Sequence, residues 1–267
     1  MVQEGLISKI SNSIKDSQKK PALIPFIVSG YPDIEITKNL LLKFQESGVA
    51  AIELGVPFSD PLADGAVIQK ASKEALAAGI NLDKIFDMLD EMGEKIKTPI
   101  ILFSYFNPIL AYGVENFIQK ASKLNVAGLI VPDLPIEESE AISSLCIKEN
   151  IDFIKLIAPT SDKSRISKIS KGSTGFIYLV SSTGVTGVRE GFSDILSEIT
   201  ADIKNTTDIP VAVGFGVSKP EHIKELKKLG ADAVIVGSAI VKLMEQYKED
   251  KSLLISKVEL YLNSLYR

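Results

Sequence analysis

The chain has 267 residues, of which 45% are hydrophobic and 24% are charged, and its formal net charge is −4. This balance is typical of a globular protein and argues against a disordered chain, a nucleic-acid partner or an anionic membrane partner. The sequence has one cysteine, no signal-peptide pattern at its start and no apolar run of the ~18 residues that span a membrane, so we expect a soluble cytoplasmic protein.

Eight short runs with strand character follow one another along the chain. They cover residues 23–29, 50–57, 99–106, 128–134, 152–159, 175–182, 210–216 and 232–238. The segments between them are too long for hairpin turns and carry helical periodicity, as in the spacing of Ile36, Leu40, Leu41 and Phe44. Eight alternating strands and helices without a linker favour one (β/α)8 TIM barrel over residues 1–267.

An open doubly wound sheet is the alternative fold. It would often carry a G-x-G-x-x-G turn after its first strand, where this chain has VSGYPDIE. The flanking segments LISKISNSIKDS and DKSLLISKVELYLNSLY are predicted to form extra helices that cap the barrel ends.

The second predicted strand carries an acid in an apolar run, AAIELGVP. Because side chains alternate along a strand, Glu53 shares a face with Ala51 and Gly55, while the bulkier residues between them face the helices. Glu53 is therefore predicted to point into the barrel near the carboxyl end of its strand, where barrel active sites form. The alternative is a structural interior glutamate with a hydrogen-bonding partner.

Two aspartates, Asp60 and Asp64, follow Glu53 in the next loop. Either one alone could cap a turn or the helix that begins after Gly65. Together with Glu53, a loop carboxylate over the barrel mouth could divide the roles of general acid and general base. Spacing does not decide which aspartate takes part.

A phosphate site is predicted after the last two strands. Gly216, Gly237 and Ser238 could offer backbone N–H groups there, although the glycines could also only turn the chain. The loop of residues 182–192 contains three glycines that would suit a mobile lid. His222 is the only histidine, so a zinc site of the usual nitrogen and sulfur ligands cannot be assembled, and no metal is expected.

The segments PFIVSGYPD, ELGVPFSDPLADGAVIQ, STGVTG, VGFGVS and VGSAIV occur in this order. With them the chain resembles the α subunit of tryptophan synthase over essentially its whole length. The resemblance implies a lyase of tryptophan biosynthesis that cleaves indole-3-glycerol phosphate to indole and glyceraldehyde 3-phosphate. It also implies an α2β2 heterotetramer in which a pyridoxal-phosphate-dependent β subunit receives the indole, with no cofactor on this chain.

The resemblance also assigns residues. It implies that Glu53 shuttles the proton between indole C3 and the glycerol hydroxyl, that Asp64 binds the indole N–H, and that Asp60 lies in the loop near the partner. The substrate would be flanked by Phe26, Tyr105, Tyr178, Thr186, Phe215 and Ile235, and its phosphate would be held by Gly187, Gly216, Gly237 and Ser238. Ala66 stands where many members have proline, and Ser182 stands where some have arginine. These departures bear on loop rigidity and on the strength of closure.

Two other functions are compatible with the residues. One is another phosphate-binding barrel, such as an isomerase or an aldolase, and Schiff-base chemistry would need Lys155 to point into the barrel. The other is a non-catalytic subunit that only activates a partner, which the presence of both Glu53 and Asp64 argues against.

Overall fold

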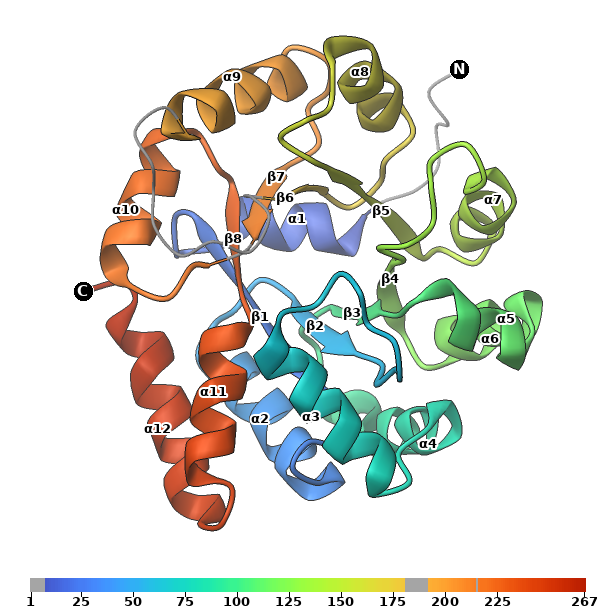
Figure 1. Cartoon of the computed structure of the whole chain (residues 1–267), viewed down its shortest axis with the longest axis vertical. Coiled ribbons are helices and arrows are strands. Elements are labelled where there is room, and N and C mark those ends of the chain that lie inside the picture. The colour runs from blue at the N-terminus through green and yellow to red at the C-terminus, as the bar shows by residue number, and fades with distance from the viewer. Residues whose placement is uncertain (1–7, 181–191, 215) are drawn as a thin grey trace.

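The computed structural model describes residues 8–180, 192–214 and 216–267, without the side chains of residues 192–194. Eight parallel strands form a closed barrel in chain order, surrounded by helices (Figure 1). The strands are β1 (Ala22–Val28), β2 (Ile52–Gly55), β3 (Ile100–Phe103), β4 (Val126–Ile130), β5 (Asp152–Ile157), β6 (Ile177–Val180), β7 (Val211–Gly214) and β8 (Ala233–Val236). The predicted barrel is confirmed, and each of the eight predicted runs overlaps a strand, although β1 and β4 begin before their predicted runs.

Helices connect the strands on the outside of the barrel (Figure 1). They are α2 (Ile34–Glu46), α3 (Ala66–Ala77), α4 (Leu82–Met92), α5 (Phe106–Tyr112), α6 (Val114–Lys123), α7 (Glu140–Lys148), α8 (Lys163–Lys171), α9 (Phe192–Lys204), α10 (Pro220–Lys228) and α11 (Ser238–Tyr247), with a short 3-10 turn η1 (Gly93–Lys95). The amino terminus of α2 is capped by Asp33, whose carboxylate accepts the Ile36 N–H at 2.8 Å. The predicted stripe of α2 is buried.

The helix α1 (Lys9–Asp16) closes the amino-terminal end of the barrel, as predicted. Ser8 Oγ donates to Asp152 Oδ2 at 2.6 Å, and Ser13 Oγ donates to the Ala50 carbonyl at 2.6 Å. Both acceptors lie at or just before the start of a strand. Ile10 of this helix is fully buried and lies close to Gly128 of β4, so the barrel interior is closed by apolar packing at this end.

The carboxyl-terminal helix α12 (Lys251–Ser264) differs from the expected cap. It packs against α2 and α11 on the outer side of the ring (Figure 1). Its buried residues Leu254, Val258 and Leu262 recur every four positions and so form one stripe. This stripe covers neighbouring helices instead of strand ends. None of the helices in the described ranges is long and apolar enough to cross a membrane.

Candidate active site

Glu53 lies inside the barrel on β2, next to Phe26 of β1 and Ile101 of β3 in the strand register. The residue is only 1% exposed, and its Oε1 has no hydrogen-bonding partner among the described residues. Burial raises the pKa of the Glu53 carboxyl to about 8, because the charged form loses its hydration. At neutral pH this group is therefore mainly a carboxylic acid that can give up a proton.

Asp64 lies in the loop between β2 and α3 and is half-buried. Tyr105, which directly precedes α5, donates its hydroxyl proton to Asp64 Oδ2 at 3.2 Å and accepts the Ala63 N–H at 2.9 Å. Burial raises the pKa of Asp64 to about 6, and the hydrogen bond from Tyr105 opposes that shift. At neutral pH Asp64 is mainly ionised, unlike Glu53.

Tyr178 of β6 interacts electrostatically with both of these carboxyl groups. Burial raises the pKa of its hydroxyl well above the usual range, and the negative charges of Glu53 and Asp64 add to the effect. A Cβ atom on Gly214 of β7 would clash with the Tyr178 hydroxyl oxygen, so only glycine leaves room for the ring. The structure therefore brings Glu53, Asp64 and Tyr178 to one space at the carboxyl end of the barrel.

Phe26 is held in place by two glycines. A Cβ on Gly55 would lie 2.7 Å from the Phe26 ring and a Cβ on Gly237 would lie 3.1 Å from it. Ile235, which is paired in register with Gly214, is also buried. Phe26, Tyr178 and Ile235 thus line the same end of the barrel as Glu53.

Sequence reasoning missed two aromatic residues of this wall. Phe103 packs its ring edge-on against Phe26 at 5.6 Å between centroids, and Phe58 stacks on Tyr105 at 5.2 Å. Strand alternation in IILF places Phe103 on the same face as Ile101 and could have found it. Phe58 lies in a loop, where no periodic pattern marks it.

The predicted phosphate residues lie around the start of α11. Gly237 is the residue before the helix and Ser238 is its first residue, and no side chain caps this helix. The unpaired N–H groups of a first helical turn suit an anion. Gly216, with φ of 76°, is exposed and has open space around its Cα. The predicted residues Thr186, Gly187 and Phe215, and the loop with Ser182, lie outside the described residues.

Three other candidates are placed elsewhere. Asp60 is exposed in the loop before Asp64. Lys155 lies on the outer face of β5, where its Nζ would be 2.7 Å from a Cβ on Gly172 at the end of α8. This position contradicts the Schiff-base alternative, because the amine cannot face a substrate inside the barrel. His222 Nδ1 accepts the Ser218 N–H at 3.2 Å, and the described part of the chain contains no cluster of three metal-binding side chains.

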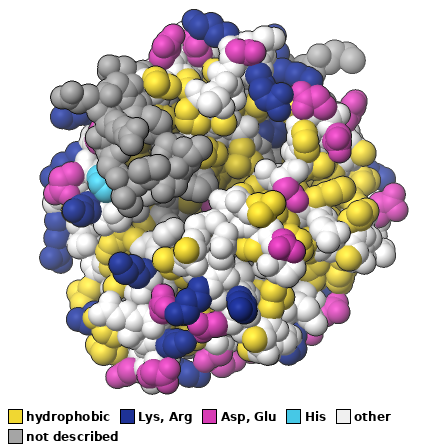
Figure 2. All heavy atoms as spheres, viewed as in Figure 1, with side chains coloured by type: hydrophobic (Ala, Val, Ile, Leu, Met, Phe, Trp, Pro, Cys, Tyr) yellow, Lys and Arg dark blue, Asp and Glu magenta, His cyan; other side chains and the backbone are white. Residues whose placement is uncertain are grey.

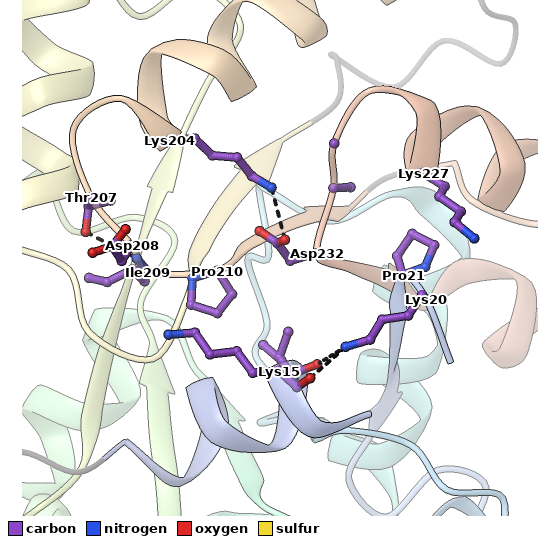
Figure 3. A pocket seen from close by; sticks show the side chains of 13 residues that line it. Lys15, Lys20, Pro21, Lys204, Thr207, Asp208, Ile209, Pro210, Lys227 and Asp232 are labelled. Carbon is purple, nitrogen blue, oxygen red and sulfur yellow. Dashed lines mark hydrogen bonds and ion pairs between the residues drawn. The ribbon is translucent and has the colours of Figure 1, made fainter. Parts of the chain in front are cut away.

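A separate pocket of about 550 Å³ opens at the amino-terminal end of the barrel (Figure 3). Its lining includes Lys15 and Lys20 of the α1 region, Lys204 at the end of α9, and Asp232 just before β8. Lys204 Nζ and Asp232 Oδ1 form an ion pair at 3.0 Å, and Lys20 Nζ donates to the Lys15 carbonyl at 2.7 Å. The pocket lies at the end opposite the carboxyl groups, so it is no part of their site.

Comparisons with known proteins agree with the barrel fold. A family profile described as tryptophan synthase alpha chain matches residues 13–266. The alpha chain of Prochlorococcus marinus is 48% identical over 236 residues, 88% of each chain, and that of Synechococcus elongatus is 49% identical over 230 residues, 86% of each chain. In the structure of a tryptophan synthase complex from Pyrococcus furiosus, one chain is 36% identical with a TM-score of 0.82, and the match covers 92% of this chain and 97% of that chain. The chain belongs to the tryptophan synthase alpha chain family.

Proposed function

We propose that this protein is a carbon–carbon lyase that cleaves indole-3-glycerol phosphate to indole and glyceraldehyde 3-phosphate. The observation that carries the proposal is a pair of carboxyl groups in one barrel mouth with different pKa values, about 8 for Glu53 and about 6 for Asp64. Two such groups can act as acid and base in one reaction at neutral pH. Family membership supports the choice of substrate.

The reaction needs a proton at indole C3, because the ring leaves only when that carbon is protonated. The neutral Glu53 carboxyl gives this proton to C3, and the Asp64 carboxylate accepts a hydrogen bond from the indole N–H, where positive charge develops. The Glu53 carboxylate then takes the proton of the hydroxyl on the glycerol carbon bonded to C3. As the carbon–carbon bond breaks, its electrons restore the aromatic ring, an aldehyde forms, and Glu53 is again neutral.

The substrate binds at the same end of the barrel as the two carboxyl groups. The phosphate is held at the start of α11 by Gly237 and Ser238, with Gly216 beside it, and the family resemblance assigns Gly187 to the same phosphate site. The indole ring lies among the buried side chains Phe26, Tyr178 and Ile235. The family resemblance assigns Thr186 and Phe215 to substrate binding as well. This chain needs no cofactor for the proton transfers, because both are carried by Glu53.

We further propose that the chain works as one half of a heterotetramer with a β subunit that carries pyridoxal phosphate. The barrel mouth offers a surface for a partner, because Leu62 is 90% exposed and Leu110 of α5 is 56% exposed. Figure 2 shows hydrophobic side chains gathered over α5 on this face. The buried free thiol of Cys146 fits the reducing conditions of the cytoplasm, where we place the enzyme.

The direct test measures indole release from indole-3-glycerol phosphate by the purified chain, with and without a cognate β subunit. We expect turnover by the wild-type chain, a higher rate on mixing, and no measurable indole with Glu53→Gln, because the amide cannot exchange the proton. Phosphate-ligand binding should persist in that variant.

A matched control is Asp152→Asn, which alters another buried carboxyl at the opposite end of the barrel. This variant should keep its turnover number at a temperature where it is folded. Normal turnover by Glu53→Gln would refute the mechanism. A wild-type chain that releases no indole but stimulates the β subunit would instead identify a non-catalytic, partner-activating subunit.

A further inference from the structure

We propose that Tyr105 is a positioning residue, whose hydroxyl orients the Asp64 carboxylate and keeps it ready to accept the substrate N–H. The proposal rests on the function proposed above, since it assigns a role within that site. In this role Tyr105 does more than flank the substrate, because it acts on the substrate through Asp64.

The geometry of the loop between β2 and α3 supports this role. The Tyr105 ring stacks on Phe58 at the start of the loop, with 30° between the ring planes. At the other end of the loop, its hydroxyl accepts the Ala63 N–H and donates to Asp64 Oδ2. One side chain thus holds both ends of the segment that carries Asp64.

Tyr105 itself has a fixed position. It is buried, its ring packs edge-on against Phe103 at 6.4 Å between centroids, and the next residue, Phe106, donates its N–H to Asp133 Oδ1 at 2.9 Å. A rigid donor of this kind fixes the direction of the carboxylate it contacts. Because the hydroxyl engages Oδ2, the indole N–H would be taken by the other oxygen, Oδ1.

The hydrogen bond also favours the ionised form of Asp64. The other ionisable groups that face Asp64 among the described residues are Tyr178 of β6, through its charge interaction, and Glu53 of β2 in the same mouth. Asp133, after β4, acts electrostatically on Tyr105. None of these is a cation, so the Tyr105 hydroxyl is the contact on this side that stabilises negative charge on Asp64. Its loss should raise the pKa of Asp64.

The test compares Tyr105→Phe with Tyr112→Phe. Both tyrosines donate to an aspartate at 3.2 Å, but the partner of Tyr112 is the exposed Asp83, away from the site. Tyr105→Phe keeps the ring and its stacking on Phe58. We expect its kcat at pH 7 to fall roughly tenfold or more, which corresponds to one hydrogen bond to a charged group, with a smaller change in KM.

The decisive measurement is the pH dependence of kcat/KM. In Tyr105→Phe the acidic limb should move to higher pH, because protonation now removes the Asp64 carboxylate more readily, while Tyr112→Phe should leave the limb in place. A lower rate with an unmoved acidic limb would overturn the proposal and leave Tyr105 a packing residue. Absence of indole release by the wild-type chain would instead refute the proposed function, so the two failures are distinct.

Discussion

At the residue scale, two carboxyl groups differ because their surroundings differ. Glu53 is enclosed in the barrel and its Oε1 has no partner in the described part of the chain, so the neutral form is favoured. Asp64 keeps partial access to solvent and receives the Tyr105 hydrogen bond, so its pKa rises less. The sequence predicted the inward direction of Glu53 from strand alternation. It could not separate Asp64 from Asp60 without the resemblance, because the contact that distinguishes Asp64 joins residues 41 positions apart.

These environments predict a bell-shaped dependence of kcat/KM on pH. The proposed mechanism requires an ionised Asp64 and a protonated Glu53, so the rate should rise as pH passes about 6 and fall as pH passes about 8. The apparent values belong to the pair, since the two groups interact. The profile is measured by indole release between pH 5 and pH 10, from about one unit below the lower pKa to about two units above the higher one. Activity that stays constant up to pH 10 would contradict a general-acid role for Glu53.

At the element scale, the strands were predictable because each is a short apolar run between periodic helices. The small helix α5 was not, because seven residues are too few to show a clear 3.6-residue period. The place of α12 was also missed, since its stripe of buried residues indicates that one face is covered but not by which element. The position of α1 was easier to predict, because a short helix before the first strand can reach only one end of the barrel.

The contact between α1 and the amino-terminal end of the barrel leads to a prediction about stability. A Cβ on Gly128 of β4 would lie 2.6 Å from Ile10 Cδ1 of α1, so Gly128→Ala should lower the free energy of unfolding by about 1–3 kcal/mol through overpacking. Ile10→Val removes that methyl group and should recover part of the loss, which a double-mutant cycle in urea would measure. Recovery should be incomplete, because Ile154 Cδ1 would remain 3.0 Å away. Strictly additive effects would show that α1 does not press on this strand.

At the scale of the whole molecule, the two ends of the barrel have different roles. The amino-terminal end is closed by α1, whose serines bind strand starts, so this end serves stability. The carboxyl end holds the carboxyl groups and exposes Leu62 in the loop that leads to Asp64. Because Ala63, next to Leu62, is hydrogen-bonded to Tyr105, a partner that docks on this loop would contact the segment that carries Asp64, the proposed partner of the indole N–H. Docking of a partner on this loop would therefore couple partner binding to the position of Asp64.

This arrangement predicts where substitutions separate partner binding from catalysis. Leu62→Asp combined with Leu110→Asp should weaken association with the β subunit by roughly 10- to 100-fold, because a charge replaces an apolar contact at an interface. The variant should keep the basal rate of indole release and lose stimulation at β-subunit concentrations that saturate the wild-type chain. The matched control is Leu260→Asp on α12, where the leucine is similarly exposed at 58% but lies on the outer helical ring. Association is measured by titration with the β subunit, and equal weakening by the control, or none by the double variant, would contradict a docking surface at the barrel mouth.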